Sequence, residues 1–275
     1  MRHVKKLSAV ILFVILFVML TLLGEPTAVW APVLQYERVE EVPILYIDDA
    51  IPSEYELPDT YIEVIEEPAE RKPMVALTFD DGPSQHTDRI LNVLDRYGGR
   101  ATFFVLGSRI GPYRDTVIRA ADLGNEIANH GWTHTNLTRL MRGGIEWEIT
   151  ATSIVIASAV GYSPPIMRPA FGATNRNVRY VAEELGYSII NWNVDTMDWR
   201  YRCPNHIYNV IMNRAADGSV ILLHDIHVTT ADAMERVIPR LIEEGFQLVT
   251  VSELKEYFYG ELVPGRIYGV SFERN

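Results

Sequence analysis

Two acidic residues and two histidines form a candidate metal site. Asp80 and Asp81 are adjacent, and His130 and His134 are separated by Gly-Trp-Thr. Two imidazole nitrogens and one carboxylate oxygen make up the ligand set of an open catalytic zinc site. The same set also suits non-haem iron oxygenases, so these four residues alone leave two chemistries open.

A base and an acid beside the metal would distinguish hydrolysis from oxygen chemistry. If Asp81 is a metal ligand, Asp80 stays free to take a proton from water, and His224 can protonate a leaving group. Arg168 can offset the mutual repulsion of the two carboxylates, although a surface salt bridge is the alternative interpretation of this residue. No cosubstrate site for an oxygenase is identifiable, so the residues favour hydrolysis.

The elements that must position these residues alternate between strand and helix. From residue 72 onward, the expected strands are 74–79, 101–106, 126–128, 166–167, 188–193, 219–223 and 247–251. The expected helices are 87–97, 113–123, 145–160, 177–185, 207–215, 231–244 and 253–259. Strands separated by helices pair in parallel through right-handed crossovers. About seven such units predict an α/β fold, a barrel more than an open sheet.

Ionisable residues follow five of these strands. In a barrel of this kind, the residues just past the carboxyl ends of the strands line the active site. We therefore expect one cluster that contains Asp80, Asp81, His130, His134, Arg168, Asp195 and His224.

Five short segments, in order, resemble the motifs of a known family. They are Thr78-Phe79-Asp80-Asp81-Gly82-Pro83, Asn129-His130-Gly131-Trp132-Thr133-His134, Arg168-Pro169-Ala170-Phe171-Gly172, Asp195-Thr196-Met197-Asp198-Trp199 and Leu222-Leu223-His224. Over roughly residues 72–258, the chain resembles the polysaccharide deacetylases, also called the NodB homology or carbohydrate esterase 4 family. The resemblance implies a distorted (β/α)7 barrel, the NodB-like deacetylase barrel.

The resemblance also implies a role for each residue at a matching position. Asp81, His130 and His134 would bind a divalent metal, usually Zn²⁺. Asp80 would be the general base, oriented by Arg168. His224 would be the general acid, tuned by Asp195, and Asp198 would be as much structural as functional. The backbone N–H of Phe171 would stabilise the oxyanion, and Trp199 and Leu222 would line the pocket for the acetyl methyl group.

Two positions depart from the family pattern. Gly131 stands where the family prefers Ser or Thr, so a hydrogen bond that orders the loop is expected to be missing. Ala170 and Phe171 replace the usual Pro-Tyr, which preserves a backbone N–H contact but not a contact through a Tyr hydroxyl. Neither departure removes a metal ligand or a proton-transfer group.

The segment Leu223-His224-Asp225-Ile226-His227 looks most like the bacterial peptidoglycan branch of the family. The resemblance therefore implies removal of N-acetyl groups from N-acetylglucosamine-type units of a cell-wall polysaccharide. N-acetylmuramic acid, chitooligosaccharides and O-acetyl xylan remain alternative substrates, and a non-catalytic wall-binding protein is the least favoured alternative.

The amino-terminal quarter has a different composition. Residues 1–24 hold Arg2, Lys5 and Lys6 before an apolar run, which predicts a membrane anchor or a cleaved signal peptide that exports the rest of the chain. Residues 25–71 form an acidic, Pro-rich linker, and residues 72–275 the deacetylase domain. We expect a cell-membrane protein with an extracytoplasmic catalytic domain, or a secreted one, and a monomer.

The charge distribution argues against a nucleic-acid partner. The net charge is -11 over the whole chain, and it is concentrated in the linker, so the main domain has no basic face of the kind that nucleic acids require. The single cysteine excludes an intramolecular disulfide.

Overall fold

The computed structural model describes residues 71–163 and 165–269, together with the backbone of residues 272–273. The predicted membrane segment 1–24 and all of the predicted linker except Arg71 lie outside the described residues. Among the helices that are described, none combines the length and apolar character needed to cross a membrane.

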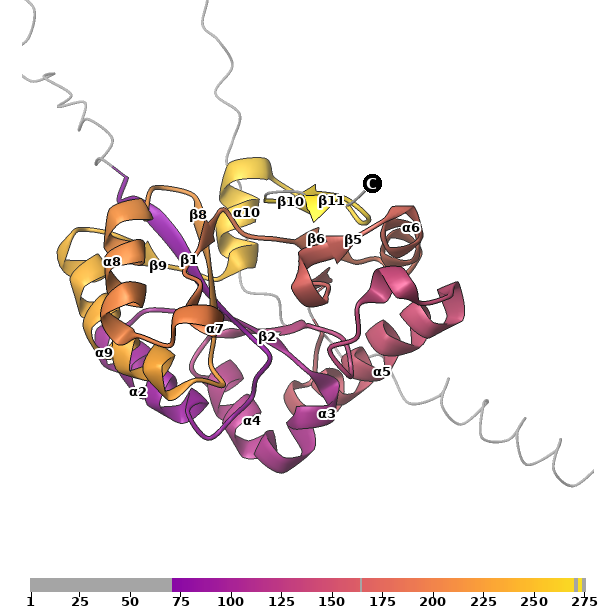
Figure 1. Ribbon diagram of the computed structural model, residues 1–275, viewed down its shortest axis with the longest axis horizontal. Helices are drawn as coiled ribbons and strands as arrows, with labels where there is room; N and C mark the ends of the chain where they lie inside the picture. Colours follow the sequence, from indigo (N-terminus) through magenta and orange to yellow (C-terminus); the bar gives the residue numbers. More distant parts are fainter. Residues whose placement is uncertain (1–70, 164, 270–271, 274–275) are drawn as a thin grey trace, which may run out of the picture. The chain divides into compact units, whose positions relative to one another are not determined.

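One parallel sheet forms the centre of the domain (Figure 1). From one edge to the other its strands are β10 (Ile267–Tyr268), β6 (Ser188–Ile190), β4 (Ile166–Met167), β3 (Glu126–Asn129), β2 (Thr102–Val105), β1 (Met74–Asp80), β8 (Ser219–His224) and β7 (Val194–Asp195). A further strand, β9 (Gln247–Leu248), pairs with the first two residues of β1. Two short strands, β5 (Ala173–Thr174) and β11 (Phe272–Glu273), pair apart from this sheet.

Helices connect the strands, as parallel pairing requires. They are α2 (Thr87–Tyr97), α3 (Gly107–Ile110), α4 (Arg114–Asp122), α5 (Arg142–Val160), α6 (Arg176–Glu184), α7 (Asp198–Tyr201), α8 (Pro204–Arg214), α9 (Val228–Glu243) and α10 (Val251–Tyr259). Three short 3-10 turns are η1 (Gly111–Tyr113), η2 (Leu137–Arg139) and η3 (Ala170–Gly172). Helices α2, α8 and α9 lie close together along β1 and β8 (Figure 1).

The two faces of β1 belong to different parts of the core. Val75, Leu77 and Phe79 point toward a large apolar cluster shared with α2, α4, α8 and α9. Met74 and Ala76 point to the opposite, inner face, where they pack with residues of neighbouring strands. Because side chains alternate along a strand, both faces of β1 are apolar and its sequence is an almost unbroken apolar run.

The predicted α/β fold with parallel strands is confirmed, and the sheet curls into a half-barrel. Every predicted strand and helix has a counterpart, and α2 has the predicted bounds. The strand predicted at 188–193 is shorter than expected, because β6 ends at Ile190 and a second strand, β7, begins at Val194. Several short elements were not predicted, namely α3, α7, β5, β7, β10 and β11, since elements of two to four residues carry almost no periodic signal.

Candidate active site

Strand alternation carries the reactive residues onto the inner face of the half-barrel. On β1 the inner positions continue from Met74 and Ala76 to Asp80, and on β8 they continue from Val220 and Leu222 to His224. The register between these strands aligns Asp80 directly with His224. The candidate base and the candidate acid therefore occupy the same level of adjacent parallel strands.

The same alternation applies to the neighbouring strands. Ala128 on β3 and Ile166 on β4 belong to the inner cluster, and His130 and Arg168 lie two residues beyond them. The backbone N–H of Arg168 donates to the carbonyl of Asn129 at 2.9 Å, which aligns the end of β4 with the end of β3.

Asp81, His130 and His134 converge at the predicted metal site. One potential ligand atom from each of the three residues lies within 4.8 Å of the other two. Asp81 Oδ1 is 3.3 Å from His130 Nε2 and 3.2 Å from His134 Nε2, yet this buried oxygen makes no hydrogen bond within the described residues. Two imidazole nitrogens and one carboxylate oxygen that lie this close together fit a divalent cation. The residues therefore fit the predicted metal.

The orientation of His130 is fixed by the atom on the far side of its ring. His130 Nδ1 lies 2.7 Å from the carbonyl oxygen of Arg168. A carbonyl can only accept, so Nδ1 carries a proton, and this contact turns Nε2 toward the site.

The metal-site residues stand on unusual backbone. Asp81 has φ 71°, His134 has φ 62° and Gly131 has φ 82°. Non-glycine residues rarely adopt such angles, and those that do cluster at functional sites. The positive φ also explains the departure at position 131, because glycine adopts this conformation without a steric penalty.

A buried glutamate orders the loop between the two histidines. Glu148 Oε2 accepts hydrogen bonds from the N–H groups of Trp132 at 2.6 Å and Thr133 at 3.0 Å, and Oε1 accepts from Thr133 Oγ1 at 2.6 Å. The loop is thus held by α5, although residue 131 lacks a hydroxyl. Sequence reasoning missed Glu148, because nothing in the sequence distinguishes it from other glutamates of a helix.

Arg168 and Asp80 form a buried ion pair. Arg168 Nη1 donates to Asp80 Oδ1 at 2.6 Å and to Thr78 Oγ1 at 2.8 Å, and Nε donates to the carbonyl of Ile190 at 3.0 Å. The guanidinium also lies 4.1 Å from the ring centre of Phe104 and is completely buried. The alternative of a surface salt bridge is wrong, and Arg168 holds Asp80 in a single orientation.

Asp198, rather than Asp195, is the partner of His224. Asp198 Oδ1 lies 2.8 Å from His224 Nδ1, and Asp198 Oδ2 accepts from the His224 N–H at 2.8 Å and from Thr230 Oγ1 at 2.7 Å. Asp195 instead accepts from the backbone N–H of Met197. The resemblance implied that Asp195 tunes His224, but Asp198 occupies that position. The reason is strand register: β7 aligns Asp195 with Leu222, and the next three residues bring Asp198 to His224.

The environment of each charged group sets its protonation. Burial lowers the pKa of His224, but the hydrogen bond and charge of Asp198 outweigh it and raise the pKa to about 9. Burial opposes ionisation of Asp81, yet the two neighbouring histidines hold the pKa of its carboxyl well below the usual value. Burial lowers the pKa of His134. At neutral pH the site therefore has an ionised Asp81 and a protonated His224 before any cation binds.

These groups open onto one cavity of about 330 Å³. Its lining contains the expected base, acid, metal ligands and pocket residues, namely Asp80, Asp81, His130, His134, Phe171, Asp195, Trp199, Leu222 and His224, and also Trp192. Trp192 was not predicted, since it lies past the end of β6 where the sequence gives no sign of a chemical role. Arg168 lies behind Asp80, outside the cavity lining.

Known proteins are similar to this chain in sequence and in fold. The family model for polysaccharide deacetylases matches residues 67–190. A solved structure of the peptidoglycan deacetylase PdaC from Bacillus subtilis is 43% identical, with a TM-score of 0.65, over 68% of this chain and 91% of that chain. The chain belongs to the polysaccharide deacetylase family.

Two curated members of the polysaccharide deacetylase family are similar over the same region. The peptidoglycan-N-acetylmuramic acid deacetylase PdaC of Bacillus subtilis is 44% identical over 184 residues, which are 66% of this chain and 39% of the relative. The peptidoglycan-N-acetylglucosamine deacetylase PgdA of Listeria monocytogenes is 40% identical over 188 residues, which are 68% of this chain and 39% of the relative. The chain thus spans about two fifths of the length of these relatives.

Proposed function

We propose that the protein is a metal-dependent hydrolase that removes N-acetyl groups from amino sugars of peptidoglycan and releases acetate. One observation carries the proposal. A carboxylate held by a buried arginine and an imidazole held by a buried aspartate occupy aligned positions on adjacent strands, and both line the cavity that contains the three candidate ligands.

The proposed metal would be Zn²⁺, held by Asp81, His130 and His134. A divalent ion in this position supplies Lewis-acid polarisation of the amide carbonyl and of a water molecule. The choice of zinc rests on the donor set, two imidazoles and one carboxylate, which is typical of open zinc sites.

The chain's own residues then move the protons. Asp80 takes a proton from water, whose oxygen forms a bond to the amide carbon. The N–H of Phe171 donates to the developing oxyanion. His224, protonated at neutral pH because its pKa is raised to about 9, gives a proton to the nitrogen as the C–N bond breaks. Acetate and a free amine leave, and Asp198 holds the imidazole in place throughout.

Peptidoglycan is the proposed substrate because the curated relatives are named for it. One relative is named for N-acetylmuramic acid and the other for N-acetylglucosamine, so their names alone do not select the sugar. We propose N-acetylglucosamine, with N-acetylmuramic acid, chitooligosaccharides and O-acetyl xylan as the alternatives to test. Trp199 and Leu222 would pack against the acetyl methyl group and the sugar ring.

The proposed location is outside the cytoplasm, attached to the membrane by the amino-terminal segment or released from it. The support is the apolar run after Arg2, Lys5 and Lys6. Cell fractionation, with detection by an antibody to the catalytic domain, distinguishes the membrane-attached form from the released form. Protein found only in the cytoplasmic fraction would contradict the proposal. We also propose a monomer, which sedimentation analysis tests.

The central experiment measures acetate release by the purified full-length protein with Zn²⁺. N-acetylglucosamine oligomers, purified peptidoglycan and acetylated xylan are offered separately, and mass spectrometry of the digested muropeptides identifies the deacetylated sugar. We expect Asp80→Asn to abolish release, since an amide cannot accept the proton. Asp95→Asn, an exposed carboxylate on α2, should retain activity. Full activity of Asp80→Asn would refute the assignment of the base.

A further inference from the structure

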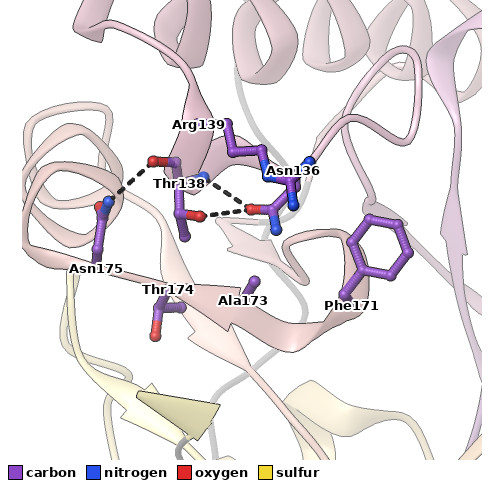
Figure 2. Close-up of a pocket in the computed structure, with 7 residues that line it drawn as sticks. All are labelled: Asn136, Thr138, Arg139, Phe171, Ala173, Thr174 and Asn175. Carbon is purple, nitrogen blue, oxygen red and sulfur yellow. Dashed lines mark hydrogen bonds between the residues drawn. The ribbon is translucent and has the colours of Figure 1, made fainter. Parts of the chain in front are cut away.

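A second cavity, of about 570 Å³, adjoins the active site. The ring of Phe171 belongs to the linings of both cavities. The second lining joins two loops, one after His134 and one after Arg168, and includes Asn136, Thr138, Arg139, Phe171, Ala173 and Asn175 (Figure 2). A polymer whose acetylated unit occupies the first cavity can therefore place the next unit along in the second.

The charge of the second cavity is positive. Among the described residues that line it, Arg139 is the single ionisable one and none carries a carboxylate. Arg139 is exposed, and within the part of the chain that the structure describes it has no ion-pair partner, in contrast to Arg142, which pairs with Glu146 and Glu184. A guanidinium with free donors is suited to two-point recognition of a carboxylate.

The polar wall of the cavity is already ordered. Asn136 Oδ1 accepts from the N–H of Thr138 at 3.0 Å and from Thr138 Oγ1 at 2.7 Å, and Asn175 Nδ2 donates to the carbonyl of Thr138 at 3.3 Å. Figure 2 shows Thr138 and Asn136 between Asn175 and Phe171. Because its oxygen is engaged, the amide of Asn136 has only N–H groups left to offer, and these are donors for a hydroxyl or an anion.

We propose that this second cavity recognises a carboxylate on the sugar next to the one that is deacetylated, and that Arg139 is the residue that determines this specificity. The inference rests on the proposed function and names its substrate more closely. Alternate sugars of peptidoglycan carry a lactyl group, whose carboxyl is free or is linked to a peptide with carboxylates of its own. The neighbour of an N-acetylglucosamine unit in this polymer thus supplies the anion, whereas chitin and xylan backbones do not.

Three substrates of equal length separate the possible sources of the carboxylate. They are a neutral N-acetylglucosamine oligomer, a glycan with free lactyl carboxylates, and the same glycan with stem peptides attached. We expect wild-type kcat/KM to be highest for one of the two anionic glycans, and the preferred one identifies the source. Arg139→Gln should lower kcat/KM on that glycan by about 10- to 100-fold, mainly through KM, as expected for loss of a charge-assisted hydrogen bond.

The controls distinguish loss of specificity from loss of folding or of the basic activity. Arg139→Gln should lower kcat/KM on the neutral oligomer much less than on the preferred anionic glycan, and Arg139→Lys should recover part of the preference. Arg214→Gln, an exposed arginine at the end of α8, should match the wild type on all three. Equal effects of Arg139→Gln on neutral and anionic substrates would overturn the specificity role while leaving the deacetylase function intact. No acetate from any substrate would overturn the function itself.

Discussion

His224 Nδ1 lies 2.8 Å from Asp198 Oδ1, and the carboxylate of Asp198 is completely buried. Two backbone N–H groups, from Trp199 and His224, and the hydroxyl of Thr230 also donate to this carboxylate. These hydrogen bonds and the charge of His224 favour the ionised carboxylate and lower its pKa against the effect of burial. The proposed acid is fixed in position by a single side chain.

The first prediction concerns the alkaline limit of activity. Wild-type activity should decline as the pH rises through about 9, where His224 loses its proton. In Asp198→Asn the charge that raises the pKa is removed while burial, which lowers it, remains. The decline should therefore move to lower pH by at least one unit in profiles of kcat against pH. Asp195→Asn should leave the limit in place, and an unchanged limit in Asp198→Asn would show that Asp198 does not tune the acid.

The second prediction concerns stability and pH. Because the pKa of His224 in the folded protein lies above its ordinary value of 6.5, the stabilisation by the His224–Asp198 pair is fully present below that value. It is lost as the pH rises through about 9. The free energy of unfolding in urea should fall between pH 6 and pH 10 more steeply in the wild type than in Asp198→Asn. Parallel profiles for the two proteins would contradict the assignment.

The third prediction concerns the buried ion pair of Arg168 and Asp80. Removing one partner leaves a buried charge without compensation, so Arg168→Met should lower the free energy of unfolding by about 3–5 kcal/mol. Adding Asp80→Asn should recover part of the lost free energy of unfolding, because it removes the buried negative charge that Arg168→Met leaves unpaired. A double-mutant cycle in urea measures the coupling. Additive effects of the two substitutions would mean that the pair does not act as a unit.

The fourth prediction concerns the metal. Chelation should abolish acetate release and lower the Tm, and Zn²⁺ should restore both. At a free concentration 100 times the Kd, a bound ion adds about 2.7 kcal/mol of stability. Asp81→Asn is a matched control, since asparagine tolerates the φ of 71° at this position but removes the charge. Its Tm should not respond to Zn²⁺, and a response equal to that of the wild type would exclude Asp81 as a ligand.

The fifth prediction compares two glycines, Gly131, which has a positive φ, and Gly143, which lies in a helix. Gly131 has φ +82°, and a Cβ there would lie 3.2 Å from Glu148 Oε2, whereas a Cβ at Gly143 would meet no atom of the described residues within 4 Å. Gly131→Ala should therefore lower the free energy of unfolding by about 1–2 kcal/mol. Gly143→Ala, inside α5, should raise it by about 0.5–1 kcal/mol. A neutral or stabilising Gly131→Ala would argue against the positive φ.

Much of the site was predictable from local sequence because strand alternation is local. The period of two that places Ala76 and Val220 inside the half-barrel also places Asp80 and His224 there. The ionisable residues therefore gather at the carboxyl ends of the parallel strands. Residue type and spacing made Asp81, His130 and His134 candidate metal ligands, and its position after β4 made Arg168 a candidate site residue.

The sequence does not show which aspartate contacts His224, because Asp195 and Asp198 are the same residue type and lie only three positions apart. Register decides between them, since β7 aligns Asp195 with Leu222. The turn at Met197, with φ 54°, then leads the chain to Asp198. The roles of Glu148 and Trp192 depend in the same way on contacts between segments far apart in the chain.

The sequence by itself determined the inventory of the candidate site: the proposed ligands, base and acid, and the order of the strands that carry them. These follow from composition, alternation and motif order, all of which act over a few residues. Tertiary structure alone decided which carboxylate holds His224, how Arg168 is buried against Asp80, and that a cationic cavity adjoins the site at Phe171. Those relationships depend on strand register and loop packing, which are set by the free energy of the whole fold rather than by any one segment.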